Sequence, residues 1–463
     1  MERTLIGDTP KKLNEKILVN GWVSAVRDHG KIKFVDISDR SGVLQAILSD
    51  PPRVDPSRLD EADKLSESRR VLKDEISIED VLELVGAVKK RPEKMVNPNI
   101  PTGEIELEVA DLKILEKSEE LPFDMGGTDL NVSLETLLDY RPLVLKHPKI
   151  KAIFKVQEVI VQAFRESLKN LGFTEIFVPT LVPVATEGGA EVFKVNYYDG
   201  SAYLAQSPQL YKQIMVGVFE RVFTLAHAYR AEPSVTTRHM SEYLSLDCEF
   251  GFIKDFSDIM DTAEAVVRNL FVVVNEKCSV ELGFYNAKTP LVSDKIPRIK
   301  MREAQRIILE RTGRDNTKEP DLSPEDEKEI CKYSEEKYKS ELIFITHYPT
   351  KKRPFYTYPS DDDPEYTDSF DLLGRGLEWI TGGRRISSYK KLLDNMGKWG
   401  NKKEDFEIYL QAFKYGMPPE GGFAIGAERV TMQILGLKNI REASLFPRDM
   451  QRVDIKIANK KSD

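Results

Sequence analysis

Apolar and polar residues alternate in short runs over the first 113 residues, as they do in half-buried strands. The runs KILVNGWVSAV, KIKFVDISD and VLQAIL occupy residues 16–48, with a turn at residues 39–42. Two further runs, VLELVGAVKK and EIELEVADLKIL, follow a polar stretch at residues 56–72 that we expect to be helical. Short strands with a helix among them favour an OB-fold barrel, a common platform for single-stranded nucleic acid.

The pattern changes after a polar connector at residues 114–145. Ile153, Val156, Ile160 and Leu168 recur at helical spacing up to Gly172, and the run FTEIFVPTLV predicts a strand after this helix. Pro179 within that run cannot donate a ladder hydrogen bond, so it marks an edge or an interface. We therefore predict an α+β multidomain protein with a barrel at 1–113, a hinge at 114–145 and a larger domain at 146–463.

Composition narrows the class of protein. Of 463 residues, 31% are charged and 41% hydrophobic, which is typical of a globular protein. The formal net charge of −8 gives no overall attraction to nucleic acid, so RNA binding would need local basic patches. The three cysteines are far apart and fit neither a disulfide framework nor a zinc site. With no apolar run long enough to span a bilayer and no secretory signal, we expect a cytoplasmic protein.

The candidate chemistry is concentrated between two apolar runs at residues 222–226 and 243–250. Their connection carries Arg230, Glu232, Arg238, His239 and Glu242. Arginine offers bidentate geometry to phosphate oxygens, and nearby carboxylates can hold Mg²⁺ or orient an amine. A charged loop alone is also compatible with a solvated hairpin tip.

The order of these residues adds a second indication. Arg-Ala-Glu, Thr-x-Arg-His and then Asp-x-Glu on the returning strand resemble motif 2 of the class II aminoacyl-tRNA synthetases that charge Asp, Asn and Lys. The segment GGFAIGAERV resembles motif 3, and the helix and strand around Pro179 resemble motif 1, the homodimer interface of that family. The resemblance implies an antiparallel catalytic sheet flanked by helices, preceded by the OB barrel.

The resemblance implies an ATP site around motif 2. Arg230 is expected at the α-phosphate, with Glu232 near the adenylate and the end of the tRNA. Arg238 and His239 are expected to reach the β- and γ-phosphates, and Tyr243 to stack on adenine.

Motif 3 and the strand before it would complete that site. Arg429 is expected on the opposite face of adenine, and Glu378 and Thr381 match the positions that ligate Mg²⁺, with Asp371 as a supporting acid. Carboxylate and hydroxyl oxygens suit this ion. Ala424 stands where the family usually has glycine.

The amino-acid pocket would use residues from several segments. The loop TEGGAE is expected to close over the substrate, with Glu187 at its α-amino group. Gln206 to Gln213 read QSPQLYKQ, which resembles aspartyl relatives. In that resemblance two cations hold the substrate carboxylate, so a neutral asparagine would leave both unneutralised at a cost. The expected aspartate-binding set is Glu187, Ser207, Gln209, Lys212, Asp247 and Arg385.

The barrel also resembles the anticodon-binding domain of aspartyl-type synthetases. Phe34 is expected to stack on an anticodon base, and Gln45 and Glu106 to read base edges. Physically, an aromatic face accepts any splayed base and an amide pairs with a base edge. Arg27, Lys89 and Arg91 are candidates for phosphate contacts. For each position the alternative is structural: Phe34 in the core and the basic residues as ordinary surface.

The resemblance therefore implies an ATP-dependent aspartate–tRNA ligase that requires Mg²⁺ and charges either tRNA-Asp alone or tRNA-Asp and tRNA-Asn. The alternatives are an asparaginyl-tRNA synthetase, a non-charging RNA-binding paralogue and an amide synthetase on the same catalytic fold. Ser387 stands where the family usually has histidine. The acidic run at residues 358–368 fits either a metal site or a solvated loop, and the charged stretch at residues 303–326 is expected to be a peripheral helical insertion.

Overall fold

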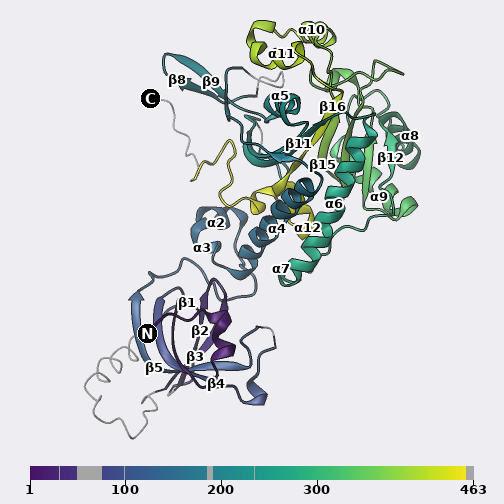
Figure 1. Ribbon diagram of the computed structural model, residues 1–463. Helices are drawn as coiled ribbons and strands as arrows, with labels where there is room; N and C mark the ends of the chain where they lie inside the picture. The colour runs from purple at the N-terminus through teal and green to yellow at the C-terminus, as the bar shows by residue number, and fades with distance from the viewer. Residues whose placement is uncertain (31, 50–75, 99, 185–190, 234, 455–463) are drawn as a thin grey trace. The chain divides into compact units, whose positions relative to one another are not determined.

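A computed structural model describes residues 1–30, 32–49, 76–98, 100–184, 191–233 and 235–454 (Figure 1). Contacts divide the chain into two compact units, residues 1–132 and 133–463. The division falls inside the expected connector at 114–145. The expected helix at 56–72 lies outside the described residues.

The first unit is a closed five-stranded barrel with strand order β1-β2-β3-β5-β4. Its strands are β1 (Lys16–Asp28), β2 (Ile32–Asp39), β3 (Gly42–Ser49), β4 (Val81–Lys90) and β5 (Ile105–Glu116), with the 3₁₀ turns η1 (Ile6–Lys12) and η3 (Glu93–Met95) beside them. β3 and β5 pair in parallel, whereas the other pairs are antiparallel. This is the OB fold that the runs predicted.

Alternation along the strands builds the barrel interior. In β1, Ile17, Val19, Gly21 and Val23 are buried, Leu18 and Asn20 are partly exposed, and Trp22 is exposed. The inward side chains form one apolar cluster with those of the other strands. Closing the sheet removes its free edges and leaves the outward residues available for contacts.

The second unit is built on an eight-stranded mixed sheet in the order β12-β13-β14-β15-β16-β11-β10-β6. Its edge strands, β6 and β12, pair in parallel with their neighbours, and the others pair antiparallel. The strands are β6 (Thr174–Glu175), β10 (Arg221–Tyr229), β11 (Glu242–Gly251), β12 (Arg298–Lys300), β13 (Leu342–Thr346), β14 (Ser369–Gly374), β15 (Leu377–Arg384) and β16 (Glu420–Gly426). A small sheet in the order β7-β9-β8 comprises β7 (Leu181–Val182), β8 (Lys194–Tyr197) and β9 (Gly200–Leu204).

Helices cover both faces of the large sheet. The long helices α4 (Pro148–Asn170) and α6 (Ser257–Lys277) pack with α12 (Ala427–Leu435) on one face, and α8 (Met301–Thr312) and α9 (Pro324–Tyr338) pack on the other face. β13 shows the division, because Phe344 belongs to the first cluster and its neighbours Ile343 and Ile345 to the second. The remaining helical segments are α2 (Leu134–Asp139), α3 (Arg141–Val144), α5 (Gln209–Phe219), α7 (Ser279–Phe284), α10 (Tyr389–Lys398), α11 (Glu407–Lys414), η4 (Thr350–Lys352), η5 (Lys403–Phe406) and η6 (Ile440–Ala443).

Two expectations about elements were wrong. The run FTEIFVPTLV is not one strand: it holds β6 and β7, which join different sheets, and Pro179 lies between them in neither. Proline lacks the N–H that a continuous ladder would need. The stretch at residues 303–326 is also not peripheral, because Ala304 and Ile308 of α8 are fully buried against the sheet.

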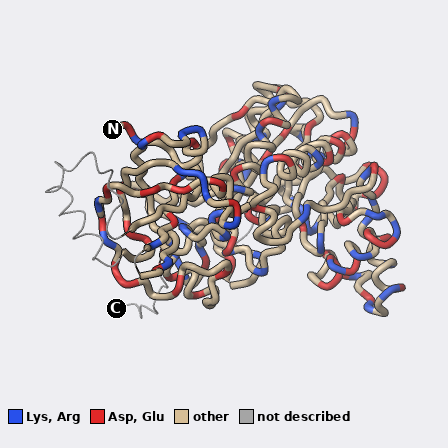
Figure 2. Tube along the Cα trace, turned by 90° about the horizontal axis from the view of Figure 1, so that it is seen from below, with Lys and Arg blue, Asp and Glu red and all other residues tan. Residues whose placement is uncertain are grey.

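Charge is distributed evenly over the chain. Figure 2 shows lysine and arginine interspersed with aspartate and glutamate along the trace. Among the described residues, no helix is long and apolar enough to cross a membrane.

Candidate active site

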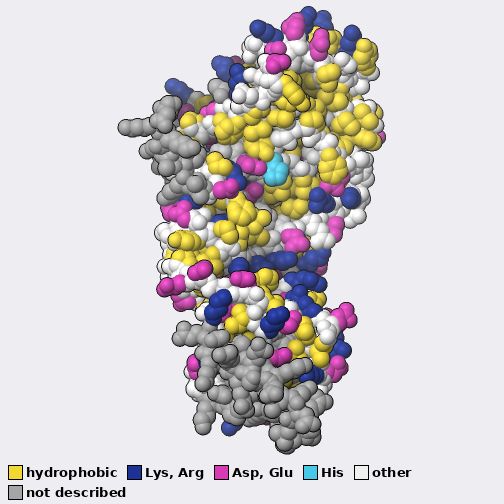
Figure 3. Space-filling view, turned by 90° about the vertical axis from the view of Figure 1, so that its left-hand side faces the viewer, with side chains coloured by type: hydrophobic (Ala, Val, Ile, Leu, Met, Phe, Trp, Pro, Cys, Tyr) yellow, Lys and Arg dark blue, Asp and Glu magenta, His cyan; other side chains and the backbone are white. Residues whose placement is uncertain are grey.

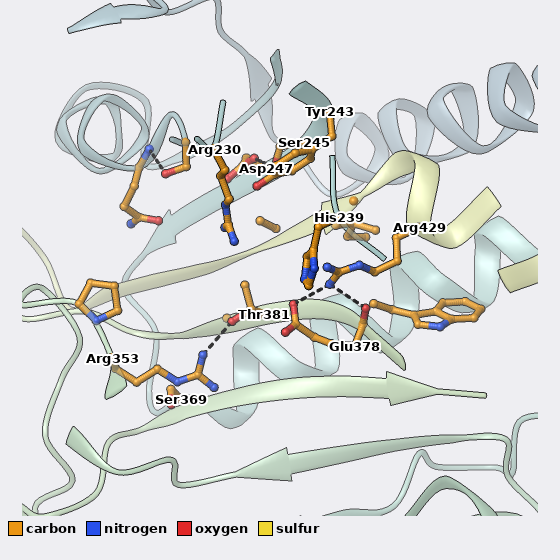
Figure 4. A pocket seen from close by; sticks show the side chains of 18 of the residues that line it. Arg230, His239, Tyr243, Ser245, Asp247, Arg353, Ser369, Glu378, Thr381 and Arg429 are labelled. Atoms are coloured by element: carbon orange, nitrogen blue, oxygen red, sulfur yellow. Dashed lines mark hydrogen bonds and ion pairs between the residues drawn. The ribbon is translucent and has the colours of Figure 1, made fainter. Parts of the chain in front are cut away.

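A cavity of about 450 Å³ opens on the face of the large sheet that α9 shares. This volume is in the range of small-molecule sites. In Figure 4, Arg230 and His239 point into it from one side, and Arg353 and Thr381 approach from the other. The cavity brings together predicted residues from the whole second unit: Ser207, Gln209, Lys212, Arg230, Glu232, Arg238, His239, Tyr243, Asp247, Glu378, Thr381, Arg385 and Arg429.

Strand β11 supplies one wall. Residues two apart on a strand share a face, so Tyr243, Ser245, Asp247 and Glu249 form one row. The sequence analysis gave Glu249 no role, although the same alternation could have placed it beside Asp247. Gly422 lies opposite Glu249 on β16, where a Cβ atom would overlap the Glu249 carboxylate.

A β-bulge in β15 places two further residues on the cavity face. Glu378 and Thr381 are three apart, so a regular strand would point them to opposite faces. The register shifts at this point, with Ile380 opposite Leu372 and Glu378 opposite Leu373, which leaves Trp379 as the extra residue. The bulge therefore lets both residues line the cavity.

One end of the cavity holds two buried cations that are already paired. Lys212 Nζ lies 2.8 Å from Asp247 Oδ1 and 3.1 Å from Glu249 Oε2, and Arg385 Nε donates to Glu249 Oε1 at 2.7 Å. The expectation that these cations are unneutralised without substrate was wrong, because β11 supplies a carboxylate for each. Charge alone therefore does not exclude an asparagine side chain from this end of the cavity.

The direction of the hydrogen bonds, rather than charge, distinguishes a carboxylate from an amide at this end of the cavity. Two contacts leave one ammonium hydrogen of Lys212 available, and Arg385 Nη1 donates to no described residue. Lysine and arginine can only donate. A carboxylate placed between these two side chains could accept from both, whereas the NH₂ of a carboxamide would oppose one donor with another.

The ion pairs fix the charge states at this end. Burial by itself would lower the pKa of Lys212, but Asp247 and Glu249 raise it above its usual value. Burial would raise the pKa of Glu249, but Arg385 and Lys212 lower it. Lys212 and Glu249 are therefore both ionised at neutral pH.

A buried polar layer lies behind the cations. Arg385 Nη2 donates to Gly422 O at 3.2 Å, and Gln209 Nε2 donates to Gln213 Oε1 at 3.0 Å. Gln213 Nε2 in turn donates to Glu420 Oε1 at 2.7 Å. Burial, together with nearby Glu249, raises the pKa of Glu420 well above its usual value.

The other end of the cavity carries the motif 2 cations. The Arg230 guanidinium lies 5.6 Å from the centre of the Tyr243 ring and 3.9 Å from Glu232. His239 Nδ1 lies 3.0 Å from Thr236 Oγ1. Burial lowers the pKa of His239, and Arg429 and Arg230 lower it further against the opposing effect of Glu232, so its imidazole is neutral at neutral pH.

Arg429 and Glu378 form a pair across the cavity floor (Figure 4). Arg429 Nη1 donates to the Glu378 carbonyl at 3.0 Å and to its carboxylate at 3.2 Å. Arg429 lies in the first turn of α12, which begins at Ala427 directly after β16. The predicted adenine-facing cation and the predicted magnesium ligand are therefore in direct contact.

Arg353 is a further cavity residue that sequence patterns did not indicate. It donates to Thr381 Oγ1 at 3.1 Å, pairs with Asp371 at 2.9 Å and lies 4.1 Å from the centre of the Tyr348 ring. Burial raises the pKa of Asp371 to about 6, although Arg353 opposes the shift.

Asp371, Glu378 and Thr381 fit a magnesium ion. They present hard oxygen ligands, and Glu378 and Thr381 line the cavity, whereas Asp371 does not and its Oδ1 lies 2.9 Å from Arg353 Nη2. No group of three histidine, cysteine or acidic residues arranged for a metal occurs in the described part of the chain, so the remaining ligands would be phosphate and water oxygens.

Arg238 is held by a residue from α9. Its Nη1 donates to Glu327 Oε2 at 2.8 Å, and its Nη2 donates to Gly376 O at 3.2 Å. Burial raises the pKa of Glu327 to about 7, and Arg238 opposes this shift. No motif in the sequence pointed to Glu327.

The barrel carries a connected polar row on β1, β2, β3 and β5. Arg27 makes two hydrogen bonds to Asp36, at 2.9 and 2.8 Å, and donates to Gln45 Oε1 at 3.2 Å. Gln45 Nε2 donates to Glu106 Oε2 at 3.1 Å, and Lys89 lies opposite Glu106 on β4. Four of the six predicted anticodon residues therefore adjoin one another.

The remaining two barrel residues differ in exposure. Phe34 is partly exposed, lies opposite Arg27 on the neighbouring strand and packs edge-on to His29 at 5.6 Å. Arg91 is only 5% exposed and donates to the carbonyl of Ile105. Its burial leaves little surface for a phosphate.

Other predicted features lie outside the cavity. Glu187 falls outside the described residues. Ser387 does not line the cavity, whereas Ala424 does. In the acidic run at 358–368, Asp363 pairs with Arg302, and Asp361 and Asp368 with Arg384, as in an ordinary charged loop.

Comparison with known proteins identifies the family. Residues 133–450 match the family model described as tRNA synthetases class II (D, K and N). The chain belongs to this family. Residues 17–115 of the synthetase match an OB-fold nucleic acid binding domain. The two units are therefore the catalytic and nucleic-acid-binding parts of an aminoacyl-tRNA synthetase.

Several relatives resemble the synthetase over nearly its full length. An aspartate–tRNA(Asp/Asn) ligase of Deinococcus radiodurans is 39% identical over 98% of this chain and 99% of its own. An aspartate–tRNA(Asp) ligase of Pyrococcus furiosus is 39% identical, covering 96% and 97%. Among solved structures, asparaginyl-tRNA synthetase of Pyrococcus horikoshii with asparaginyl-adenylate is 30% identical with a TM-score of 0.83, covering 98% and 99%. Aspartyl tRNA synthetase of Entamoeba histolytica is 27% identical with a TM-score of 0.81, covering 98% and 93%.

Proposed function

We propose that this synthetase is an aspartate–tRNA ligase. The observation that carries the proposal is one cavity with two donor-only side chains, Lys212 and Arg385, at one end and the phosphate-binding candidates Arg230 and Arg429 at the other. An aspartate whose side chain meets the first pair would present its α-carboxylate toward the second. The curated relatives named as aspartate ligases support the same substrate.

The reaction would proceed in two steps. An oxygen of the aspartate α-carboxylate attacks the α-phosphorus of ATP, the bond to the bridging oxygen breaks, and pyrophosphate leaves. Arg230 would stabilise the charge that develops on the α-phosphoryl group, so its contribution is positioning and electrostatics. The 3′-hydroxyl of the terminal tRNA ribose then attacks the activated carbonyl, and AMP leaves.

A magnesium ion would be held by Glu378, with Asp371 and Thr381 beside it. When bound, the ion neutralises phosphate charge. The protein side chains orient the nucleotide: Tyr243 and Arg429 would enclose adenine, and Arg238 and His239 would face the β- and γ-phosphates. Glu187 is proposed at the α-amino group on the resemblance alone.

The barrel would bind the anticodon of tRNA-Asp. Phe34 offers a stacking face, and Gln45 and Glu106 form an adjoining hydrogen-bonding row. Arg27 and Lys89 flank this row and are the proposed phosphate contacts. Relatives at similar identity are named for tRNA(Asp) and for tRNA(Asp/Asn), so both tRNAs belong in the test.

We also propose a homodimer through the segment around Pro179. Phe177 is 87% exposed, and Leu181 and Val178 are also solvent-accessible. Large exposed apolar side chains in one segment mark an interaction surface. Figure 3, which views the side where β8 and β9 lie in Figure 1, shows hydrophobic side chains gathered over the catalytic unit. Sedimentation of the purified protein should give twice the mass of the 52.8 kDa chain, and a monomer would overturn this part of the proposal.

Aminoacylation with purified transcripts tests the function. We expect pyrophosphate exchange that depends on aspartate and not on asparagine, and charging of a tRNA-Asp transcript. Charging of tRNA-Asn with aspartate in the same assay would define a broader tRNA range. Exchange driven equally by asparagine would support an asparaginyl-tRNA synthetase, and RNA binding without exchange would support a non-charging paralogue.

A further inference from the structure

We propose that Glu327 is a positioning residue that orients Arg238 toward the polyphosphate end of the nucleotide. The inference rests on the proposed function, since it concerns the same ATP site. It assigns a role in that site to helix α9, which lies in a part of the chain outside the three class II motifs.

The N-terminus of α9 fixes where Glu327 lies. Ser323 accepts a hydrogen bond from the Asp326 N–H, and the Asp326 side chain accepts from the Ser323 N–H, so the two form a capping box. Asn316 and Arg314 each donate to Asp326 at 3.0 Å. Glu327 follows directly in this anchored first turn.

The packing of α9 directs that turn at the cavity. Ile330 and Cys331 are buried against the sheet in the same cluster as Leu373 of β14. Asp371, two residues before Leu373, shares its face and belongs to the magnesium-fitting group. Helix α9 and the nucleotide end of the cavity therefore lie on one face of the sheet.

Two hydrogen bonds fix the orientation of the Arg238 side chain and leave other N–H groups of its guanidinium available as donors. Glu327 accepts from Nη1 and Gly376 from Nη2, while Nε donates to no described residue. The side chains of Arg238 and Glu327 are 21% and 16% exposed. The guanidinium is thus held from one side, and donors remain for a phosphate oxygen on the side that lines the cavity.

An arginine in a long connection needs such an anchor. Arg238 lies between β10 and β11, and its flexible side chain loses rotamer entropy when it binds a phosphate. A fixed acceptor reduces the entropy that remains to be lost on nucleotide binding. The acceptor oxygen, rather than full negative charge, is the required feature, so glutamine should substitute for Glu327 better than alanine.

The test measures pyrophosphate exchange in the full-length protein. Glu327→Ala should raise the KM for ATP and for pyrophosphate about tenfold, because a charge-assisted hydrogen bond to an arginine is lost. The KM for aspartate should stay within about twofold, since Lys212 and Arg385 are untouched. Glu327→Gln should recover most of the loss.

Two comparisons separate positioning from a general structural effect. Glu329 is on the same helix and pairs with Arg311 at 2.7 Å, so Glu329→Ala is the matched control and should leave the KM for ATP unchanged. In a double-mutant cycle, Glu327→Ala should add little to Arg238→Ala, because it acts through that arginine.

Three results would overturn the inference. They are an unchanged KM for ATP in Glu327→Ala, equal rises in the KM values for ATP and aspartate, and full additivity with Arg238→Ala. Each requires a wild-type enzyme with aspartate-dependent exchange. Absence of exchange in the wild type would instead refute the proposed function.

Discussion

Replacing Lys212 with methionine should destabilise the catalytic unit as well as abolish aspartate activation. The Lys212 side chain is 2% exposed and lies against two carboxylates that are 1% and 0% exposed. Methionine fills a similar volume but removes the cation. Glu249 keeps Arg385 at 2.7 Å, whereas among the described residues Asp247 keeps only the hydroxyl of Ser245.

The size of the stability loss in Lys212→Met follows from the Asp247 carboxylate, which loses its cation. Breaking a buried ion pair by removing one partner costs about 3–5 kcal/mol. Lys212→Met is therefore not a change of specificity alone. The double variant Lys212→Met/Asp247→Asn removes the orphaned charge and should recover about half of the lost stability, or about 1.5–2.5 kcal/mol.

Urea unfolding followed by tryptophan fluorescence measures the stability, and aspartate-dependent pyrophosphate exchange measures the activation step. Lys398→Met, at an exposed position on α10, is the control and should change stability by less than about 0.5 kcal/mol. Wild-type stability in Lys212→Met would refute the buried pairing. Restored exchange in the double variant would refute substrate contact by Lys212.

Three further predictions address other parts of the molecule. Gly422→Ala should impair aspartate activation and stability together, because its Cβ would displace the Glu249 carboxylate; wild-type exchange would contradict the packing. Phe34→Ala should raise the KM for tRNA roughly tenfold if it stacks on a base, without altering pyrophosphate exchange; an equal effect on exchange would indicate a core role. Burial raises the pKa of Glu327 from 4.5 to about 7, so folding favours its protonated form. The contribution of this shift to the free energy of unfolding is fully present below pH 4.5 and is lost as the pH rises through 7. Glu327→Gln cannot ionise and should gain up to about 3 kcal/mol relative to the wild type between about pH 5 and 8 in urea unfolding, whereas a constant difference would contradict the shift.

The sequence determined the parts of this protein that depend on local patterns. Period-two alternation predicted the barrel strands, and helical spacing predicted α4, because each pattern makes one buried face. The order of charged residues in the connection after β10, with motif 3 downstream, indicated the family, and the resemblance pointed to thirteen of the residues that line the cavity. These signals are local in the sequence, so they can be recognised without knowledge of the tertiary contacts.

The tertiary structure decided which groups neutralise one another. Lys212 and Glu249 are far apart in the chain, and only the approach of α5 to β11 reveals that the pocket cations are already paired. The bulge at Trp379 turns Glu378 and Thr381 to one face of the sheet. Helix α9 brings Glu327 into contact with Arg238, which lies 89 residues earlier in the chain. Burial and pairing set the charge of each group, and both depend on contacts between distant segments that no local pattern specifies.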